Sequence, residues 1–336
     1  DHPEERRREY EEVKRINRDF RRLGEEFASS VPPPPKIAAL VLDESTLRES
    51  GMAIKLAKPI LRVLSEKGFC SEIAIISERH VLEGSIGGYP LVFLPKAPYM
   101  RKEVAEKLEE YVKGGGFLVI GPESGRYDEH GESYGGLCEP LRRCCGVNPR
   151  GLLHPDCDTH DFLVSQDFHR LRKGRMVRGD CFEELEVESG DVDVPLIYNW
   201  QAEQPAMVLS RYGSGRSCYL CFWPSDDVEE RGLEDVVMSL VEDAGLEPYV
   251  RVFGKDGFEE RGIIHGVRLC SGGAFLILIE TGDREHEVLV EISRGRFGFD
   301  DLEVIDGLTG ERVGSGLRFS TTLAPAQVKV LHILKR

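Results

Sequence analysis

Between Ile37 and Ile120, apolar residues alternate between short continuous runs and helical spacing. The continuous runs are Ile37–Leu42, Cys70–Ile76, Leu91–Leu94 and Phe117–Ile120. Between them, Met52–Lys67 and Val104–Val112 carry apolar residues at every third or fourth position. Continuous apolar strands that alternate with helices are typical of a parallel sheet covered on both faces, with right-handed connections. The pattern therefore predicts a doubly wound α/β unit.

Residues 1–28 predict a charged amphipathic helix. Its apolar positions recur every three or four residues, at Tyr10, Val13, Ile16, Phe20, Leu23 and Phe27. A lone helix of this kind is marginal in water, so we expect it to pack on its own domain, or to continue from a preceding one. The run Pro32–Pro35 that follows is a stiff polyproline spacer. We therefore interpret residues 1–35 as a linking segment.

The α/β domain is expected to occupy residues 36–248. Residues 147–205 show few regular patterns, and only Phe162–Val164 and Leu196–Tyr198 suggest strands, so this segment is interpreted as an irregular insertion. The sheet is expected to resume afterwards. Its later elements are the strands Ala206–Ser210 and Ser217–Trp223 and the helix Gly232–Ala244, which ends at Gly245.

Residues 249–336 have a different pattern, in which short apolar strands are separated by Gly, Asp and Arg turns and helical spacing is absent. The expected strands are Gly262–Leu269, Ala274–Glu280, Glu287–Ile292, Leu302–Ile305, Leu317–Ser320 and Val328–Ile333. This pattern predicts a small antiparallel β-sandwich.

The composition and net charge make some classes of binding partner unfavourable. The 336 residues carry a net charge of -15, which disfavours nucleic acid and anionic membranes. No apolar run reaches the ~18 residues of a membrane span, and no signal peptide is apparent. The cysteines number 9, and several lie within apolar runs, where a reduced cysteine acts as a small apolar residue. These features favour a cytoplasmic setting.

Ligands of a doubly wound sheet bind beyond the carboxyl ends of its strands. The candidate pocket residues at those positions are Asp43, Glu123, Ser124 and Trp223. The segment Pro122–Gly125 bears a weak likeness to a nucleophile elbow, but it lacks the full Gly-x-Ser-x-Gly spacing. We therefore expect Ser124 to cap the next element and assign no catalytic residue.

The densest set of metal-ligand residue types is His154, Cys157 and His160, spaced by three. Such side chains can bind Zn²⁺, but no second Cys or His pair follows at zinc-finger spacing. Cys218 and Cys221 have the spacing of a redox or zinc motif, yet they fall within a strand, where positions three apart face opposite sides. We expect core cysteines, no metal and no cofactor.

Tyr89–Pro95, Val104–Val112 and Lys113–Pro122 together resemble the trimerisation domain of the β-galactosidases of glycoside hydrolase family 42. That family shows a strand ending in Pro, a helix, a Gly-Gly turn and a strand. It also resembles this chain in its order, with an Arg- and Glu-rich linking helix before this domain and a small antiparallel β domain after it. Leu323–Leu331 resembles the last strand of that β domain. The resemblance implies a flavodoxin-like, class I amidotransferase-like fold.

In amidotransferase-like folds, the turn equivalent to Gly121–Gly125 holds a nucleophilic Cys, which this chain lacks. The resembling family carries its two catalytic glutamates in a (β/α)₈ barrel of ~250 residues, so none can be assigned here. The resemblance implies a non-catalytic portion that forms homotrimers, with a catalytic barrel as partner in a parent β-galactosidase of carbohydrate metabolism. The alternative is a free-standing amidotransferase-like enzyme or sugar-binding protein that uses the pocket at Asp43, Glu123 and Trp223.

Overall fold

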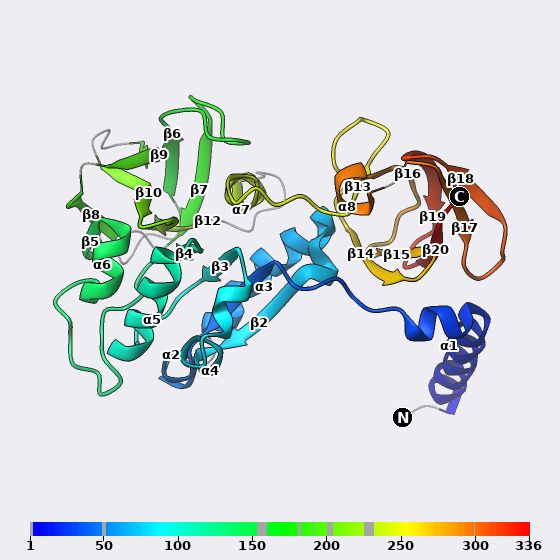
Figure 1. The fold of residues 1–336 in the computed structure, drawn as a ribbon, viewed down its shortest axis with the longest axis horizontal. Helices are drawn as coiled ribbons and strands as arrows, with labels where there is room; N and C mark the ends of the chain where they lie inside the picture. The colour runs from blue at the N-terminus through cyan, green and yellow to red at the C-terminus, as the bar shows by residue number, and fades with distance from the viewer. Residues whose placement is uncertain are drawn as a thin grey trace. The chain divides into compact units, whose positions relative to one another are not determined.

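The computed structural model divides into two compact units, and each is described by itself (Figure 1). The β unit comprises Asp1–Pro34, Ser65–Glu72 and Glu247–Arg336, and the α/β unit comprises Pro35–Leu64 and Ile73–Leu246. The structure describes residues 3–48, 52–152, 160–180, 183–189, 191–199, 204–224, 232–298 and 300–336.

The α/β unit contains one large sheet, with the strand order β12-β7-β6-β9-β10-β11-β4-β3-β1-β2. Its parallel part runs from β11 to β2. All residues of β3 and β4 are buried, as expected of strands covered on both faces. The parallel strands are β1 (Ile37–Val41), β2 (Ile73–Ser77), β3 (Leu91–Leu94), β4 (Phe117–Ile120) and β11 (Gly215–Leu220). The helices of the unit are α2 (Asp43–Arg48), α3 (Met52–Leu64), α4 (Glu78–Leu82), η3 (Ser85–Gly88), α5 (Lys102–Lys113), α6 (Glu139–Cys145) and α7 (Gly232–Asp243).

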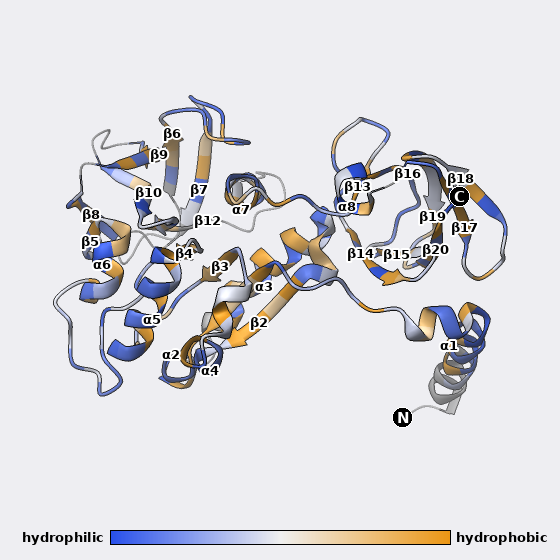
Figure 2. Ribbon diagram, viewed as in Figure 1, coloured by the Kyte–Doolittle hydropathy of each residue, from blue (hydrophilic) through white to orange (hydrophobic). Residues whose placement is uncertain are grey.

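These elements confirm the strands and helices expected between Ile37 and Ile120, except that the strand expected from Cys70 begins at Ile73, because Cys70–Glu72 forms a 3₁₀ turn. Hydropathy follows the same division, because the strands of the sheet interior are apolar while the helices carry polar residues on one side (Figure 2). The short helix α6 ends at Gly146, which is left-handed with φ 67°. A Cβ at Gly146 would lie 2.8 Å from the Ser189 side chain, so this helix end requires glycine.

The other half of the large sheet is antiparallel, which corrects the expectation of a wholly parallel sheet. The segment 147–205, in which we expected little regular structure, contains several strands that extend the sheet or form the small pair β5-β8. They are short and pair with distant partners, so local periodicity does not reveal them. The strands of this half are β5 (Val147–Leu152), β6 (His160–Val164), β7 (Met176–Asp180), β8 (Glu183–Val187), β9 (Val192–Tyr198), β10 (Pro205–Tyr212) and β12 (Trp223–Pro224).

In the β unit, two antiparallel sheets, β13-β16-β19 and β14-β15-β20-β17-β18, contribute residues to one apolar core. The expected strands are present, and the structure adds β13, β18 and the one-turn helix α8. The elements are β13 (Val250–Phe253), β14 (Ile263–Cys270), β15 (Gly273–Glu280), β16 (His286–Ile292), α8 (Arg294–Phe297), β17 (Leu302–Asp306), β18 (Arg312–Ser315), β19 (Arg318–Leu323) and β20 (Val328–Lys335).

The expected N-terminal helix is α1 (Pro3–Ser29), and its last turns pack within the β unit. The Phe27 ring meets Phe275 edge-on at 5.0 Å between centroids. The earlier apolar positions are exposed, with Tyr10 at 59% and Phe20 at 57%. Among the described residues, neither this helix nor another has the length and apolar composition needed to cross a bilayer.

The segment between α3 and β2 belongs to the β unit instead of the α/β unit that flanks it in sequence. It forms a π-helical turn, η1 (Ser65–Phe69), and a 3₁₀ turn, η2 (Cys70–Glu72). Phe69 and Glu72 are both fully buried. The Glu72 carboxylate pairs with Arg296 at 2.5 Å, so this segment contacts the C-terminal part of its own β unit.

Candidate functional site

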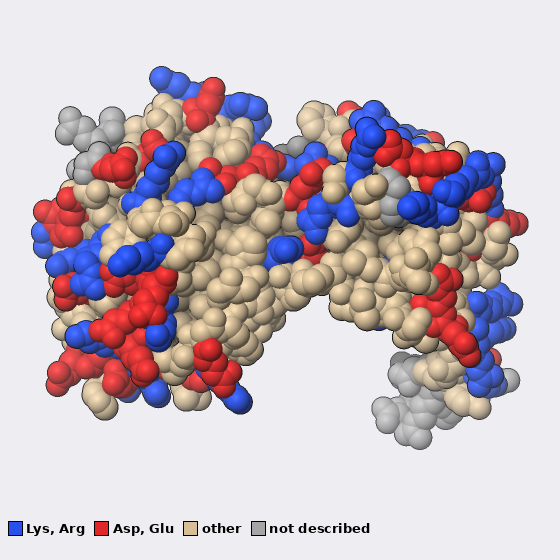
Figure 3. All heavy atoms as spheres, in the orientation of Figure 1, with Lys and Arg blue, Asp and Glu red and all other residues tan. Residues whose placement is uncertain are grey.

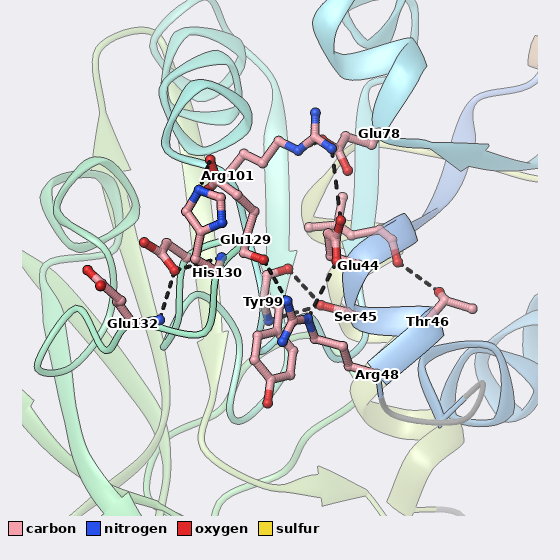
Figure 4. A network of polar contacts seen from close by, with 12 residues as sticks. Glu44, Ser45, Thr46, Arg48, Glu78, Tyr99, Arg101, Glu129, His130 and Glu132 are labelled. Atoms are coloured by element: carbon pink, nitrogen blue, oxygen red, sulfur yellow. Dashed lines mark hydrogen bonds and ion pairs between the residues drawn. The ribbon is translucent and has the colours of Figure 1, made fainter.

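The carboxyl ends of the parallel strands carry two clusters of polar side chains, and this edge is where such sheets bind ligands. The arginine network, drawn in Figure 4, follows β1, β2 and β3 and consists of Glu44, Arg48, Glu78, Tyr99 and Arg101. The elbow cluster follows β3 and β4 and is completed from β8 and β11. Its members are Lys96, Glu123, Ser124, Arg126, Glu183 and Tyr219.

Arginines hold the carboxylates of the arginine network. The Arg101 guanidinium lies 3.2 Å from the Glu78 carboxylate and 4.0 Å from that of Glu44. Arg48 lies 3.5 Å from the other oxygen of Glu44 and stacks over the Tyr99 ring, 4.9 Å from its centroid (Figure 4). Glu44 and Glu78 therefore each have a cation beside them.

Glu78 is the buried member of this network. Its pKa is raised chiefly by burial, against the lowering effect of Arg101, and the nearby charge of Asp43 raises it further. A carboxyl with a raised pKa in a cleft is a common feature of catalytic sites, but structural ion pairs give the same shift. Glu78 lies directly after β2, where the sequence analysis assigned no role.

Hydrogen bonds fix the loops that surround the arginine network. The Ser45 hydroxyl donates to the Tyr99 carbonyl oxygen at 2.7 Å, and the Tyr99 N–H donates to Ser45 Oγ at 3.0 Å. Arg48 donates to the Glu129 carbonyl oxygen at 2.7 Å. The Asp128 carboxylate accepts two backbone N–H groups of its own loop, and these bonds lower its pKa. Hydrogen bonds therefore hold the turns at this edge of the sheet in place.

Glu123 occupies the turn after β4 in a left-handed conformation, with φ 60°. This region is strained for a residue with a Cβ, and such residues often occur at functional turns. Its carboxylate pairs with the Lys96 ammonium group at 2.8 Å, and both side chains are largely buried. The carboxylate is therefore neutralised by a cation from the neighbouring strand end.

Ser124 is fully buried, and its Oγ accepts the Ala97 N–H at 3.1 Å. The hydroxyl thus joins the turn after β4 to the loop after β3, instead of capping the next helix as expected. The adjoining Gly125 N–H donates to the Ala97 carbonyl oxygen at 2.7 Å. These bonds give Ser124 a structural role at this position.

Glu183 holds the turn after β4, Gly121–Gly125, which we call the elbow. Its carboxylate pairs with Arg126, accepts the Tyr219 hydroxyl at 2.7 Å and accepts the backbone N–H of Glu123. The side chain is fully buried, and burial raises its pKa although each of these partners lowers it. A completely buried carboxylate with three donors fixes the geometry of the elbow.

The sequence-predicted pocket residues fall into different places. Glu123 and Ser124 are neighbours in the elbow cluster, whereas Asp43 begins α2 beside the arginine network. The backbone of Trp223 pairs with Asp180 in the antiparallel part of the sheet, and its side chain lies outside what the structure describes. The apolar cavity by Pro95, Gly121 and Leu220 at this edge has a volume of ≈ 10 Å³, about the room of one water molecule.

The predicted metal-ligand residues are largely outside the described part of the chain. His154 and Cys157 lie in the gap 153–159, and His160 is described only by its backbone, which pairs with Gly179 in β6 and β7. Cys218 and Cys221 are fully buried, in agreement with the interpretation that they are core cysteines.

Sequence reasoning missed Arg126, Glu183 and Tyr219, whose contacts hold the elbow. A weak signal existed for Glu183, because residues 183 and 185 are the inward positions of β8 while 184 and 186 face outward. Nothing local distinguishes it from the other acidic residues, since its partners come from the turn and loop after β4 and from β11. In the described part of the chain, the elbow side chains neutralise one another and present no exposed nucleophile.

The sequence pattern of the β-galactosidase trimerisation domain matches residues 75–247, about half of the chain. A relative, the β-galactosidase Pbg of Clostridium perfringens, is 25% identical over 67% of this chain and 30% of its own length. The structure is similar to that of a β-galactosidase from Bacillus circulans sp. alkalophilus, with a TM-score of 0.74 and 19% identity over 97% of this chain and 45% of that one.

A second similar structure is Gan42B, a GH42 β-galactosidase, with a TM-score of 0.67 and 21% identity over 90% of this chain and 41% of that one. The chain therefore spans less than half the length of the relatives that it matches. The resemblance stated from the strand-Pro, helix and Gly-Gly-strand pattern is confirmed, and this chain belongs to the family of the β-galactosidase trimerisation domain.

Proposed function

We propose that this chain is the non-catalytic, self-associating portion of a β-galactosidase-like glycoside hydrolase. The match of residues 75–247 to the β-galactosidase trimerisation domain carries this proposal. The similar solved proteins are described as β-galactosidases, and this chain corresponds to 41% or 45% of their length. We expect the catalytic barrel that the resemblance implies to lie in the remainder of such a protein.

The burial and side-chain contacts of the elbow residues support a non-catalytic role. A catalytic nucleophile must reach its substrate and have a base within hydrogen-bond distance. Ser124 is fully buried with its Oγ engaged by Ala97, and Glu123 is paired with Lys96. The backbone at Glu123 is strained, as in a nucleophile elbow. The side chains of Glu123 and Ser124, however, contact other residues of the protein.

We infer that the α/β unit is flavodoxin-like and related to class I amidotransferases. The order β2-β1-β3-β4-β11 of its parallel strands supports this, because it has the 2-1-3-4-5 sequence of that type. We retain the proposed domains 1–35, 36–248 and 249–336. The transition between compact units at Leu246 and Glu247 supports the second boundary.

We propose that the edge strand β2 takes part in the contact between copies. β2 ends the large sheet, so one side of its backbone is left for pairing. Ile75 on this strand is 65% exposed, and Figure 2 shows β2 as an apolar edge. On the face in Figure 3, the surface over β2 and α3 is largely uncharged although the chain carries a net charge of -15. A second copy of this chain carries the same net negative charge, so its charged surfaces would repel those of the first. We therefore expect a second copy to bind at the uncharged patch over β2 and α3.

Light scattering of the purified chain at micromolar concentration tests the proposal. We expect a mass three times that of the 37.7 kDa chain, and no hydrolysis of a chromogenic β-galactoside above the buffer rate. A strictly monomeric species would overturn self-association. Hydrolysis that Glu123→Ala abolishes would overturn the non-catalytic role and favour the free-standing enzyme.

We further propose a cytoplasmic location. Among the described residues, Cys138, Cys144, Cys145, Cys218 and Cys221 are buried without a disulfide. Cysteines that serve as small apolar core residues suit a reducing compartment.

A further inference from the structure

Three metal-ligand side chains meet within the β unit, and neither the family nor the proposed function assigns them a role. Glu26 lies in the last turn of α1, Cys270 ends β14, and His332 lies in β20. Their ligand atoms all lie within 4.8 Å of one another. We call this set the Glu-Cys-His cluster.

The fold of the five-stranded sheet brings Cys270 and His332 together although β15 separates their strands. The residue of β15 opposite Cys270 is Gly273, which has no side chain to separate them. A Cβ at Gly273 would meet the Ile333 carbonyl oxygen at 1.9 Å, and one at Gly272 would lie 3.4 Å from Glu26 Oε1. Gly272 therefore borders the cluster, whereas Gly273 is required by the close approach of the β20 backbone.

Two of the three separations are close to those of tetrahedral coordination. Cys270 Sγ lies 3.7 Å from His332 Nε2, and that nitrogen lies 3.6 Å from Glu26 Oε1. Zn²⁺ binds sulfur at about 2.3 Å and nitrogen or oxygen at about 2.0–2.2 Å, so its ligands stand about 3.3–3.6 Å apart. By contrast, a nitrogen–oxygen hydrogen bond has its optimum near 2.9–3.0 Å. The geometry of the histidine and the carboxylate thus suits a shared ion better than a direct bond.

The side chains are also held in place before any ligand binds. The His332 ring stacks on Phe275, with centroids 4.2 Å apart and an angle of 18° between the planes. Phe27, the residue after Glu26, packs edge-on against the same Phe275 ring. Such packing fixes ligand orientation, as supporting residues do in structural metal sites.

The protonation states are compatible with a metal ion. Burial lowers the pKa of His332, so its imidazole is neutral at pH 7, the form that binds metals. Burial and the nearby Glu26 carboxylate raise the pKa of the Cys270 thiol. An ion would therefore have to displace the thiol proton, which makes binding stronger as the pH rises.

We propose that Glu26, Cys270 and His332 bind one divalent transition-metal ion of the zinc class, with solvent as the fourth ligand. One sulfur, one imidazole nitrogen and one carboxylate oxygen form a donor set that Zn²⁺ and Co²⁺ accept. Because Glu26 belongs to α1 while the other ligands belong to the five-stranded sheet, the ion ties the end of this helix to that sheet. This differs from the sequence analysis, which expected no metal and placed its candidates at residues 154–160.

The test is a Co²⁺ titration of the reduced, chelator-treated full chain, followed by absorbance. We expect one equivalent to bind and to give a thiolate-to-cobalt charge-transfer band that Zn²⁺ removes by displacement. Cys270→Ser should abolish this band and weaken binding by at least the roughly 10- to 100-fold seen when a supporting residue of a metal site is lost. Glu26→Gln, at the exposed end of the cluster, should weaken binding without disturbing the fold.

Matched controls are Cys70→Ser, which removes an exposed cysteine of the same unit, and Cys157→Ser, which removes the cysteine of the alternative candidate. Both should retain the band. Absence of a thiolate band in the wild-type chain, or a band lost in Cys157→Ser but kept in Cys270→Ser, would overturn the proposal. Neither outcome bears on trimer formation, which light scattering measures independently.

Discussion

At the scale of single residues, Glu183 best illustrates how this fold uses a buried charge. Its carboxylate accepts the Tyr219 hydroxyl and a backbone N–H of the elbow and pairs with Arg126. Removing one partner of such a buried set is costly, because the others remain desolvated. The turn after β4 is therefore held in place by buried polar contacts.

The raised pKa of Glu183 gives a prediction with a definite sign. Folding favours its protonated form, so its contribution to stability is present below the unfolded-state value near 4.5 and is lost as the pH rises through the folded-state pKa. Glu183→Gln cannot ionise. We therefore expect the unfolding free energy of this variant, relative to the wild type, to increase between pH 4 and pH 8 in urea titrations.

The neighbouring Glu184→Gln is the control, because this residue is exposed on the opposite side of β8. Its unfolding free energy relative to the wild type should be flat over the same pH range. A Glu183→Gln difference that stays constant or falls with pH would show that the Arg126 pair outweighs burial.

At the scale of elements, the large sheet changes character between its two halves. The parallel strands β1 to β4 are nearly continuous apolar runs, whereas the parallel strand β11 and the antiparallel strands from β12 to β10 carry more polar residues. Antiparallel strands tolerate a solvated face, so their sequences carry a weaker signal. The edge strand β2, at the other end, leaves an apolar side chain exposed at Ile75.

The edge strand carries the prediction for assembly. Ile75→Asp places a charge on the proposed contact between copies, and we expect it to reduce the association constant by roughly tenfold or more, since central apolar contacts often contribute above 1 kcal/mol. Sedimentation velocity over a concentration series measures this. Val328→Asp, at an exposed apolar strand position of the β unit, should leave assembly unchanged. Equal sedimentation of both variants would place the interface elsewhere.

At the scale of the whole molecule, the β unit is discontinuous in sequence. It combines the N-terminal segment, the C-terminal segment and Ser65–Glu72, which is inserted between α3 and β2. Lys67 in that insertion is buried 3.5 Å from Glu259, and Glu72 is buried against Arg296. The chain therefore cannot be divided at Leu246 without removing partners of buried groups.

Truncation after Leu246 tests this organisation. It would expose Phe69 and remove the partners of Lys67 and Glu72, so we expect a loss of at least about 3 kcal/mol of unfolding free energy. Urea denaturation followed by circular dichroism measures the loss. A truncated chain with the midpoint of the full chain would mean that Ser65–Glu72 needs no partner from beyond residue 246.

The sequence by itself determined the features that depend on neighbours along the chain. Apolar runs and helical spacing predicted β1 to β4 and the helices α3 and α5, because strands and helices buried on a known face must carry these periods. The strand-Pro and Gly-Gly-strand pattern near Pro95 and Gly114 also indicated the family. These signals are local, so they needed no knowledge of long-range contacts.

Only the tertiary structure decided which distant residues meet. It selected Glu183 from 59 acidic residues as the support of the elbow, and it assigned Ser65–Glu72 to the β unit. It also joined Glu26, Cys270 and His332, which no spacing connects. The physical reason is that buried charges and ligand clusters arise from strand pairing and helix docking over long separations, whereas periodicity reports only the face that a residue presents.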